Sequence, residues 1–295
     1  MSKKKETKKE TNDKTIEIKP TTSKIAMMTP TGDDKFWSGH VRSLIDVYSN
    51  IPANQIFRIA ATGSVLTRNF NFMFREILRL KKEEHKDLKY MVIFHSDIEI
   101  ANPNWLNTMI GVMEDQKVDV MSLPMIVKNP EQRSSFVLRK PDPKDEYEFF
   151  IFGTQQLREL EDKGINLFDD PNLLYNTGVM VVNMDSPAFK KVVEENDVYF
   201  TITEGLTQSG TLGMFSEDWY FGELMRKAGA NMKMYLDLPT VHYGTCGWTL
   251  NKSRAGICNS PSGWHLGLKA PINAGGVRDI EDIKKRVSKG AKKKK

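Results

Sequence analysis

Residues 91–100 read Met-Val-Ile-Phe-His-Ser-Asp-Ile-Glu-Ile, an apolar run that ends among acids. The first residues predict a buried β-strand, and Asp97 and Glu99 follow where that strand gives way to a loop, beside His95. Two carboxylates at this spacing can both reach one cation, and Mg²⁺ and Mn²⁺ prefer oxygen ligands. Paired acids are also common at exposed strand ends, so this stretch alone favours the plainer interpretation.

The segments around this stretch alternate between strand and helix patterns. Strands are predicted near residues 24–30, 55–63, 89–100 and 118–127, and helices near 40–50, 67–85 and 103–116. This order predicts an α/β fold in which a central, mostly parallel sheet is flanked by helices. In such sheets ligands bind beyond the carboxyl ends of the strands, which is where Asp97 lies. The first helix is predicted from the helical spacing of Val41, Leu44, Ile45 and Tyr48.

The pattern changes after residue 127. Residues 128–172 are polar and contain prolines, which predicts an excursion with a hairpin or irregular strands. Further on, the sequence predicts a strand at 173–184 broken at Asn176 and Gly178, helices at 186–196 and 216–229, and a final strand at 232–244. The glycine-rich residues 205–216 are expected to be mobile, and residues 245–271 to be loop-like.

Composition predicts one large domain, residues 24–270, in a chain of 295 residues with 39% hydrophobic content. Residues 1–23 and 271–295 are rich in lysine and are expected to be disordered basic tails. These tails either keep the protein in solution or attract a polyanion such as nucleic acid. The chain lacks a signal-peptide pattern and a long apolar run, and Cys246 and Cys258 form no disulfide framework, so we expect a cytoplasmic protein with no membrane span.

Three further groups of residues carry candidate chemistry. Glu217 and Asp218 begin a predicted helix, where the helix dipole should keep them ionised, and an ionised carboxylate over a cleft can act as a general base. His242 ends a predicted strand and could complete a mixed oxygen and nitrogen site for a divalent cation. Arg68 precedes a helix body and could bind phosphate through two parallel hydrogen bonds. Each group also has an ordinary structural interpretation: helix start, structural histidine or solvated arginine.

Taken together, these segments resemble a GT-A-fold glycosyltransferase related to family 2, over roughly residues 24–245. The resemblance rests on the strand that ends in HSDIE, on FSEDWYFGELMRKAG (215–229) and on YLDLPTVHYG (235–244). It implies an enzyme, most simply an inverting one, that transfers a sugar from a nucleotide-diphosphate donor with the help of Mn²⁺ or Mg²⁺. The YNTGVMVVN segment (175–183) would also suit a retaining enzyme.

The resemblance also implies roles for individual residues. Asp97, Glu99 and His242 are expected to hold the metal, and Asp218, next to Glu217, to act as the catalytic base. The expected donor-binding residues are Thr29, Pro30, Arg68, His95, Ser96 and Asn176. His95 departs from the family pattern, because it stands where the first aspartate of a D-x-D motif would be.

The acceptor remains open on the sequence alone. The lysine-rich tails favour a hydroxylated base in DNA, of the kind that viral DNA-modifying enzymes use, and such a base has to leave the helix to react. A polysaccharide, lipid or protein acceptor is the alternative. A nucleotidyltransferase ranks lower, because the loop after the first strand carries Asp33 and Asp34 in place of a basic, glycine-rich signature. An inactive nucleic-acid-binding module is the alternative from another class.

Overall fold

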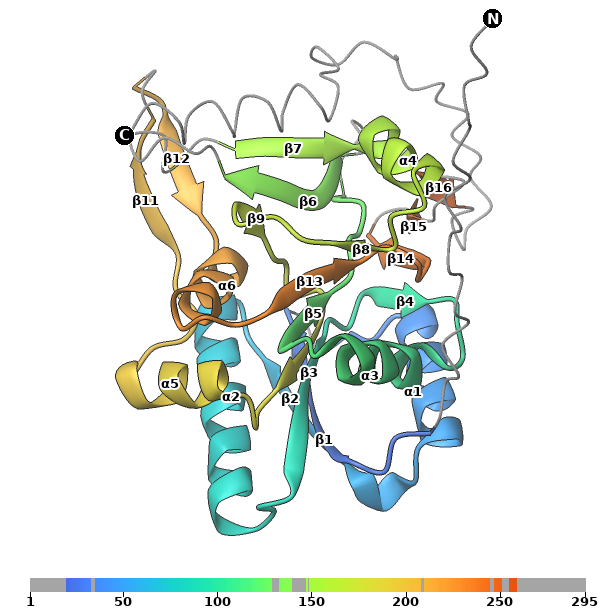
Figure 1. The fold of residues 1–295 in the computed structure, drawn as a ribbon, viewed down its shortest axis with the longest axis vertical. Coiled ribbons are helices and arrows are strands. Elements are labelled where there is room, and N and C mark those ends of the chain that lie inside the picture. Colours follow the sequence, from blue (N-terminus) through green and yellow to red (C-terminus); the bar gives the residue numbers. More distant parts are fainter. Residues whose placement is uncertain are drawn as a thin grey trace, which may run out of the picture.

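A seven-stranded sheet forms the centre of the computed structural model and confirms the predicted α/β fold (Figure 1). The structure describes residues 20–32, 35–128, 133–139, 147, 149–207, 210–244, 247–250 and 255–258. In sheet order the strands are β2 (Ile56–Thr62), β1 (Lys24–Thr31), β3 (Leu88–Phe94), β10 (Val179–Asn183), β5 (Val120–Ser122), β13 (Met232–Tyr235) and β8 (Leu167–Phe168). The sheet is mostly parallel, since only β10 and β8 run against the other five strands.

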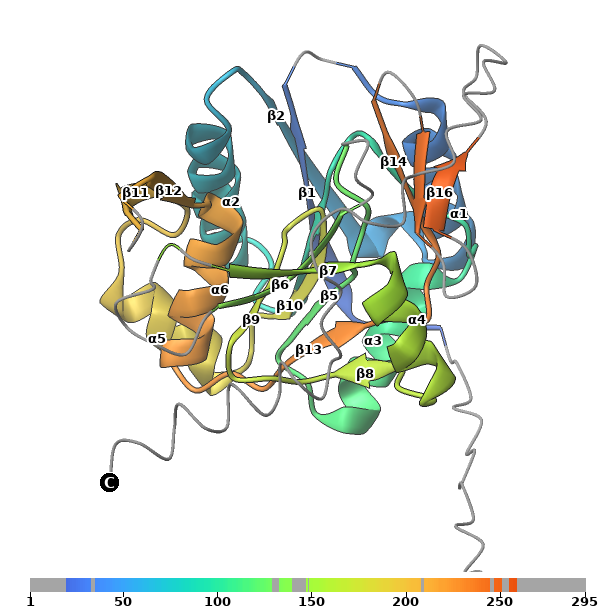
Figure 2. The ribbon, with the colours of Figure 1, turned by 90° about the horizontal axis from the view of Figure 1, so that it is seen from above.

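Helices cover both faces of this sheet, which Figure 2 shows from above. On one face lie α2 (Leu66–Glu83), α5 (Pro187–Glu195) and α6 (Glu217–Lys227), and on the other lie α1 (Ser38–Asn50) and α3 (Trp105–Gln116). Within β1, Ala26 and Met28 pack on the face that α2, α5 and α6 cover. Ile25 and Met27 pack on the face that α1 and α3 cover. Burial on both sides explains why the central strands are continuous apolar runs rather than alternating ones.

Helix α1 is present as predicted, but most of the apolar residues that indicated it are exposed. Leu44 is buried, but Val41, Ile45 and Tyr48 are exposed, and Ile45 keeps 59% of its surface accessible. The helix instead turns Gly39, His40, Ser43, Leu44 and Val47 inward. Small and polar side chains fill this contact because α1 packs closely against β4 (Ile98–Ile100), where Ser43 Oγ accepts a hydrogen bond of 2.9 Å from the backbone N–H of Ile100.

Two predicted strands are each divided in the structure. Residues 89–100 form β3 and β4, separated by a turn at His95–Asp97. Residues 232–244 form β13 in the central sheet and β14 (Thr240–Tyr243) in a second sheet, whose order is β16-β15-β14-β4. The other strands of this second sheet, β15 (Gly247–Leu250) and β16 (Ala255–Cys258), lie in the region that was expected to be loop-like.

The excursion after residue 127 contains the predicted hairpin. Its strands β6 (Arg133–Arg139) and β7 (Phe149–Gly153) pair antiparallel, and β6 also pairs with β9 (Leu173–Leu174). The helix α4 (Thr154–Asp162) was not predicted, nor was the pairing of β11 (Thr203–Leu206) with β12 (Leu212–Phe215) in the glycine-rich segment. A side chain at Gly205 or Gly213 would collide with Tyr147, so these glycines let the hairpin pack closely.

Several expectations concern residues outside the described part of the chain. They include the disorder of residues 1–19 and 259–295, the end of the domain at residue 270 and the state of Cys246. Within the described part, none of the helices combines the length and the hydropathy that a membrane crossing needs.

Candidate functional site

The turn at His95–Asp97 is held from three sides. The backbone N–H of His95 donates to the Gly178 carbonyl at 3.0 Å, and Trp37 N–H donates to Ser96 O at 3.1 Å. Tyr243 N–H donates to Asp97 O at 2.7 Å. The turn is therefore fixed by the start of α1, by the segment before β10 and by β14, and Asp97 projects from a rigid base.

Asp97 faces two basic side chains. The Nζ atom of Lys128 donates to Asp97 Oδ2, and His242 Nε2 lies 3.5 Å from the same oxygen. Burial alone would raise the pKa of Asp97, but the hydrogen bond from His242 and the charges of His242, His95 and Lys128 together hold it below its usual range. The other carboxylate oxygen, Oδ1, is buried without a hydrogen-bond partner in the described part of the chain.

His242 is oriented by its second ring nitrogen. Its Nδ1 atom lies 2.9 Å from the Ile126 carbonyl, which can only accept, so Nδ1 carries a proton. When the ring is neutral, Nε2 then presents a lone pair towards the Asp97 carboxylate. Either a proton on Nε2 or a metal ion can bridge this nitrogen and the carboxylate, and an oriented imidazole beside a carboxylate is a common half of a metal site.

Glu99 does not join Asp97 and His242. Its carboxylate is 7% exposed and accepts hydrogen bonds from Arg42, at 2.8 Å, and from the Tyr243 hydroxyl. The ring of Tyr243 in turn stacks on Trp37 at 5.4 Å. Glu99 therefore ties α1 to β14, and the described residues contain no group of three or more His, Cys, Asp and Glu side chains that could hold a metal.

Asp218 lies at the start of α6, as predicted, but its protonation differs from the prediction. Burial, followed by the negative charge of neighbouring Glu217, raises the pKa of Asp218 to about 7. The loss of hydration outweighs the favourable end of the helix dipole, so the carboxyl titrates near neutrality rather than staying ionised. Ser216 occupies the N-cap position, but its side chain makes no capping hydrogen bond.

Thr177 connects the two parts of the site and was missed by the sequence analysis. Its hydroxyl donates to Asp218 Oδ1 and lies 3.4 Å from His95 Nε2. His95 is partly buried, and desolvation lowers its pKa to about 4, so the ring is neutral at pH 7. The turn after β3 and the start of α6 are thus linked in space, although 41 residues separate Thr177 from Asp218 in the chain.

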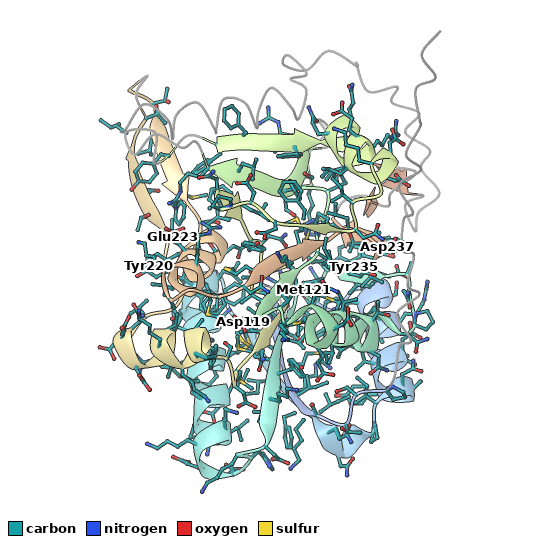
Figure 3. The ribbon with its side chains drawn as sticks, in the orientation of Figure 1. Asp119, Met121, Tyr220, Glu223, Tyr235 and Asp237 are labelled. Carbon is teal, nitrogen blue, oxygen red and sulfur yellow. The ribbon has the colours of Figure 1, made fainter. Side chains whose placement is uncertain are left out.

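A cavity of about 280 Å³ lies beside Asp218. Its lining residues are Val127, Arg133, Ser134, Ser135, Val137, Ile151, Asn176, Ser216, Asp218 and Trp219. Helix α6 is anchored against this wall by Glu223, which pairs with Arg139 of β6 at 3.4 Å and with Arg226 at 2.9 Å. Figure 3 shows Glu223 and Tyr220 on this helix. The anchoring keeps the carboxyl of Asp218 at the wall of the cavity.

The predicted donor-binding residues are only partly brought together. Ser96 lies in the turn itself, and Asn176 borders the cavity, where its side chain donates to the Leu123 carbonyl at 2.9 Å. Thr29 is fully buried on β1, and its hydroxyl has no partner in the described part of the chain. Pro30 follows it at the carboxyl end of β1.

Arg68 lies on the exposed side of the start of α2. It lines a separate cavity of about 460 Å³ together with Gly63, Ser64, Asn69 and Phe72. This cavity lies at the carboxyl end of β2, and none of its lining residues belongs to the group around Asp97. Two further residues that the sequence analysis missed, Lys128 and Trp219, lie beside predicted ones, and only their chain positions near the strand and helix ends could have pointed to them.

No protein-family model matches the chain. No curated protein matches it either. Among solved structures, protein A197 of STIV is similar at 12% identity and a TM-score of 0.46, with 87% of this chain and 99% of that chain covered.

Two enzyme structures are also similar. One is described as a UDP-N-acetylglucosamine pyrophosphorylase from Entamoeba histolytica, at 13% identity and a TM-score of 0.34, with 72% of this chain and 73% of that chain covered. The other is described as a glucose-1-phosphate thymidylyltransferase from Bacillus anthracis, at 12% identity and a TM-score of 0.34, with 86% and 97% covered. Because every one of these TM-scores is below 0.5, the similarities assign no function to this chain.

Proposed function

We propose that the protein is a glycosyltransferase that moves a sugar from a nucleotide-diphosphate donor to an acceptor hydroxyl. The observation that carries the proposal is the spatial link from Asp97 and His242, through His95 and Thr177, to Asp218. The proposal combines a candidate cation site at Asp97 and His242 with the carboxyl of Asp218, whose pKa is raised to about 7. Sugar transfer needs both, because the leaving diphosphate develops charge and the acceptor hydroxyl must lose a proton.

Asp97 and His242 fit a divalent cation that is shared with the donor. Asp97 offers a buried Oδ1 that has no hydrogen-bond partner among the described residues, and His242 offers an oriented Nε2. Mg²⁺ in particular is commonly held by one or two carboxylates together with substrate phosphates, so a third side chain is not required. When bound, Mn²⁺ or Mg²⁺ would supply charge neutralisation for the diphosphate. Glu99 is not proposed as a ligand, because its carboxylate is bound to Arg42 and Tyr243.

Asp218 is proposed to act as the general base. Its carboxylate takes the proton of the acceptor hydroxyl while the acceptor oxygen bonds to the anomeric carbon. The bond between that carbon and the diphosphate oxygen breaks, and the nucleoside diphosphate leaves with the electron pair. Such a single displacement inverts the anomeric centre. A pKa of about 7 suits this role, because a base works best when its pKa is near the operating pH.

The acceptor is proposed to be a hydroxylated base in DNA. The support is the lysine content of the two ends of the chain, six lysines in residues 1–14 and five in residues 288–295. Clustered lysines bind phosphate backbones without regard to sequence. The cavity beside Asp218 would have to admit the base, and Trp219 in its wall offers an aromatic surface for stacking.

A donor screen tests the proposal. The protein is incubated with Mn²⁺ and a panel of nucleotide sugars, with and without hydroxymethylated DNA, and the released nucleotide is identified. We expect a nucleoside diphosphate that accumulates only with one donor and rises when the DNA is present. Asp97→Ala and Asp218→Asn should each lower the rate at least about 100-fold, whereas Glu194→Gln, an exposed acid on α5, should not.

Other outcomes would contradict the proposal in different ways. If Asp97→Ala still releases the nucleoside diphosphate at the wild-type rate, the assignment of the cation site is wrong. Pyrophosphate release from a nucleoside triphosphate and a sugar phosphate would indicate a nucleotidyltransferase. DNA binding without turnover of any donor would indicate an inactive nucleic-acid-binding module.

A further inference from the structure

The hydroxyl of Thr177 lies between a neutral imidazole and the proposed base. It is fully buried, in the segment between β9 and β10. This segment is held by Asn176, whose side chain donates to the Leu123 carbonyl and accepts from Gly178 N–H at 3.1 Å. The Ser122 hydroxyl also donates to the Asn176 carbonyl at 2.7 Å. Thr177 therefore has a fixed position before any substrate binds.

The hydrogen bonds around Thr177 assign its proton. A carboxylate can only accept, so the hydroxyl proton of Thr177 points to Asp218 Oδ1. The oxygen of Thr177 is then left with lone pairs, and His95 Nε2 at 3.4 Å must carry a proton to donate to it. Donation therefore runs in one direction, from His95 through Thr177 to Asp218.

We propose that Thr177, itself oriented by His95, is the positioning residue of Asp218: it holds Oδ1 and leaves Oδ2 to take the proton of the acceptor. This inference rests on the proposed function, and it assigns a role to the histidine that stands where an aspartate is usual. His95 acts on the base indirectly, through its contact with Thr177, and is not proposed to contact the donor. An ionised aspartate at position 95 could not donate a hydrogen bond to Thr177, because a carboxylate only accepts.

The hydrogen bonds from Thr177 also affect the pKa of Asp218. Burial raises the pKa of Asp218, and the hydrogen bonds from the side chain and the backbone of Thr177 act in the opposite direction. Without the hydroxyl, the carboxyl would be protonated over more of the neutral range and would keep only the backbone hydrogen bond from Thr177. Thr177 thus keeps a buried acid both ionisable and in place.

The test compares Thr177→Val, which has the same shape without the hydroxyl, with Thr177→Ser, which keeps it. The titration of Asp218 is followed by NMR of ¹³C-labelled aspartate carboxyls, with Asp218→Asn to assign the signal. We expect Thr177→Val to raise the midpoint by about one to two pH units, the size of a charge-assisted hydrogen bond, and Thr177→Ser to restore it. His95→Phe should raise it by a smaller amount. The rising limb of the pH profile of kcat/KM should move with these midpoints.

The outcomes separate this inference from the proposed function. If Thr177→Val leaves the titration of Asp218 unchanged, the positioning role is wrong. If the midpoint shifts but the wild-type protein releases no diphosphate from any donor, the hydrogen bond is as inferred and the proposed transferase activity is wrong. Circular dichroism shows whether Thr177→Val is folded, and Thr177→Ala provides the same comparison if it is not.

Discussion

Asp218 shows how burial sets the chemistry of a single carboxyl. Its ordinary pKa of 3.8 is raised to about 7 by burial and by Glu217. Between these two pH values the folded protein binds a proton that the unfolded chain has lost. The stabilisation that follows is complete below pH 3.8 and is lost as the pH rises through 7, so Asp218 weakens the fold where it serves as a base.

Asp218→Asn should remove this dependence. Compared with wild type, its free energy of unfolding should improve by roughly 1–3 kcal/mol more at pH 8 than at pH 5, because asparagine is never charged. Urea unfolding at the two pH values measures the difference. Glu194→Gln is the control, and an equal pH dependence in wild type and Asp218→Asn would contradict the raised pKa.

At the same scale, sequence reasoning selected Asp97, Asp218 and His242 as candidates but not Thr177 or Lys128, which contact two of them. The first three stand at ends of strong strand or helix patterns, where ligands bind. Thr177 stands in a short loop and matters only because His95 and Asp218 lie on either side of it. Glu99 was assigned to the metal from its spacing to Asp97, but its actual partners, Arg42 and Tyr243, lie 57 and 144 residues away.

At the level of elements, α1 has two apolar faces and buries only one. The helical period predicts which residues share a face, but it does not say which face meets the sheet when both carry apolar residues. Ser43 and Gly39 decide it, because their size lets the helix approach β4.

The neighbouring residues Leu44 and Ile45 test this assignment. Leu44 is 5% exposed and Ile45 is 59% exposed. Leu44→Ala should lower the free energy of unfolding by about 2–4 kcal/mol, and Ile45→Ala by less than about 0.5 kcal/mol. Chemical denaturation measures both, and a larger loss for Ile45→Ala would show that its face is covered.

Gly39 and Gly111 offer a matched pair within helices. A methyl group at Gly39 would lie less than 3.0 Å from Glu99 Oε2 and the Tyr243 ring, whereas Gly111 on α3 has nothing within 4 Å. Gly39→Ala should therefore cost about 1–3 kcal/mol, and Gly111→Ala should gain up to about 1 kcal/mol from helix propensity. Thermal unfolding of the two variants checks the signs, and a stable Gly39→Ala protein would argue against the close contact between α1 and Glu99.

At the scale of the whole molecule, the lysines at the two ends should govern binding to DNA. Replacing the six lysines of residues 1–14 and the five of residues 288–295 by glutamine should weaken binding. It should also flatten the slope of log K against log salt by about two or more, since each lost phosphate contact removes about 0.9. Fluorescence anisotropy over a salt series measures this. Lys190→Gln with Lys191→Gln on α5 is the control, and an unchanged slope would place DNA binding elsewhere.

By itself, the sequence determined the alternation of strands and helices, the α/β fold and the ends of the elements at which candidate chemistry lies. These are local properties, because side-chain periodicity and turn residues act within a few positions of the chain. Only the tertiary structure decided which of these side chains lie close together and how each is protonated. The antiparallel pairing of β14 with β4 brings His242 beside Asp97, and the desolvation of Asp218 at the start of α6 raises its pKa. Contacts of this kind depend on sheet register and on the exclusion of water, and neither is encoded in a local pattern.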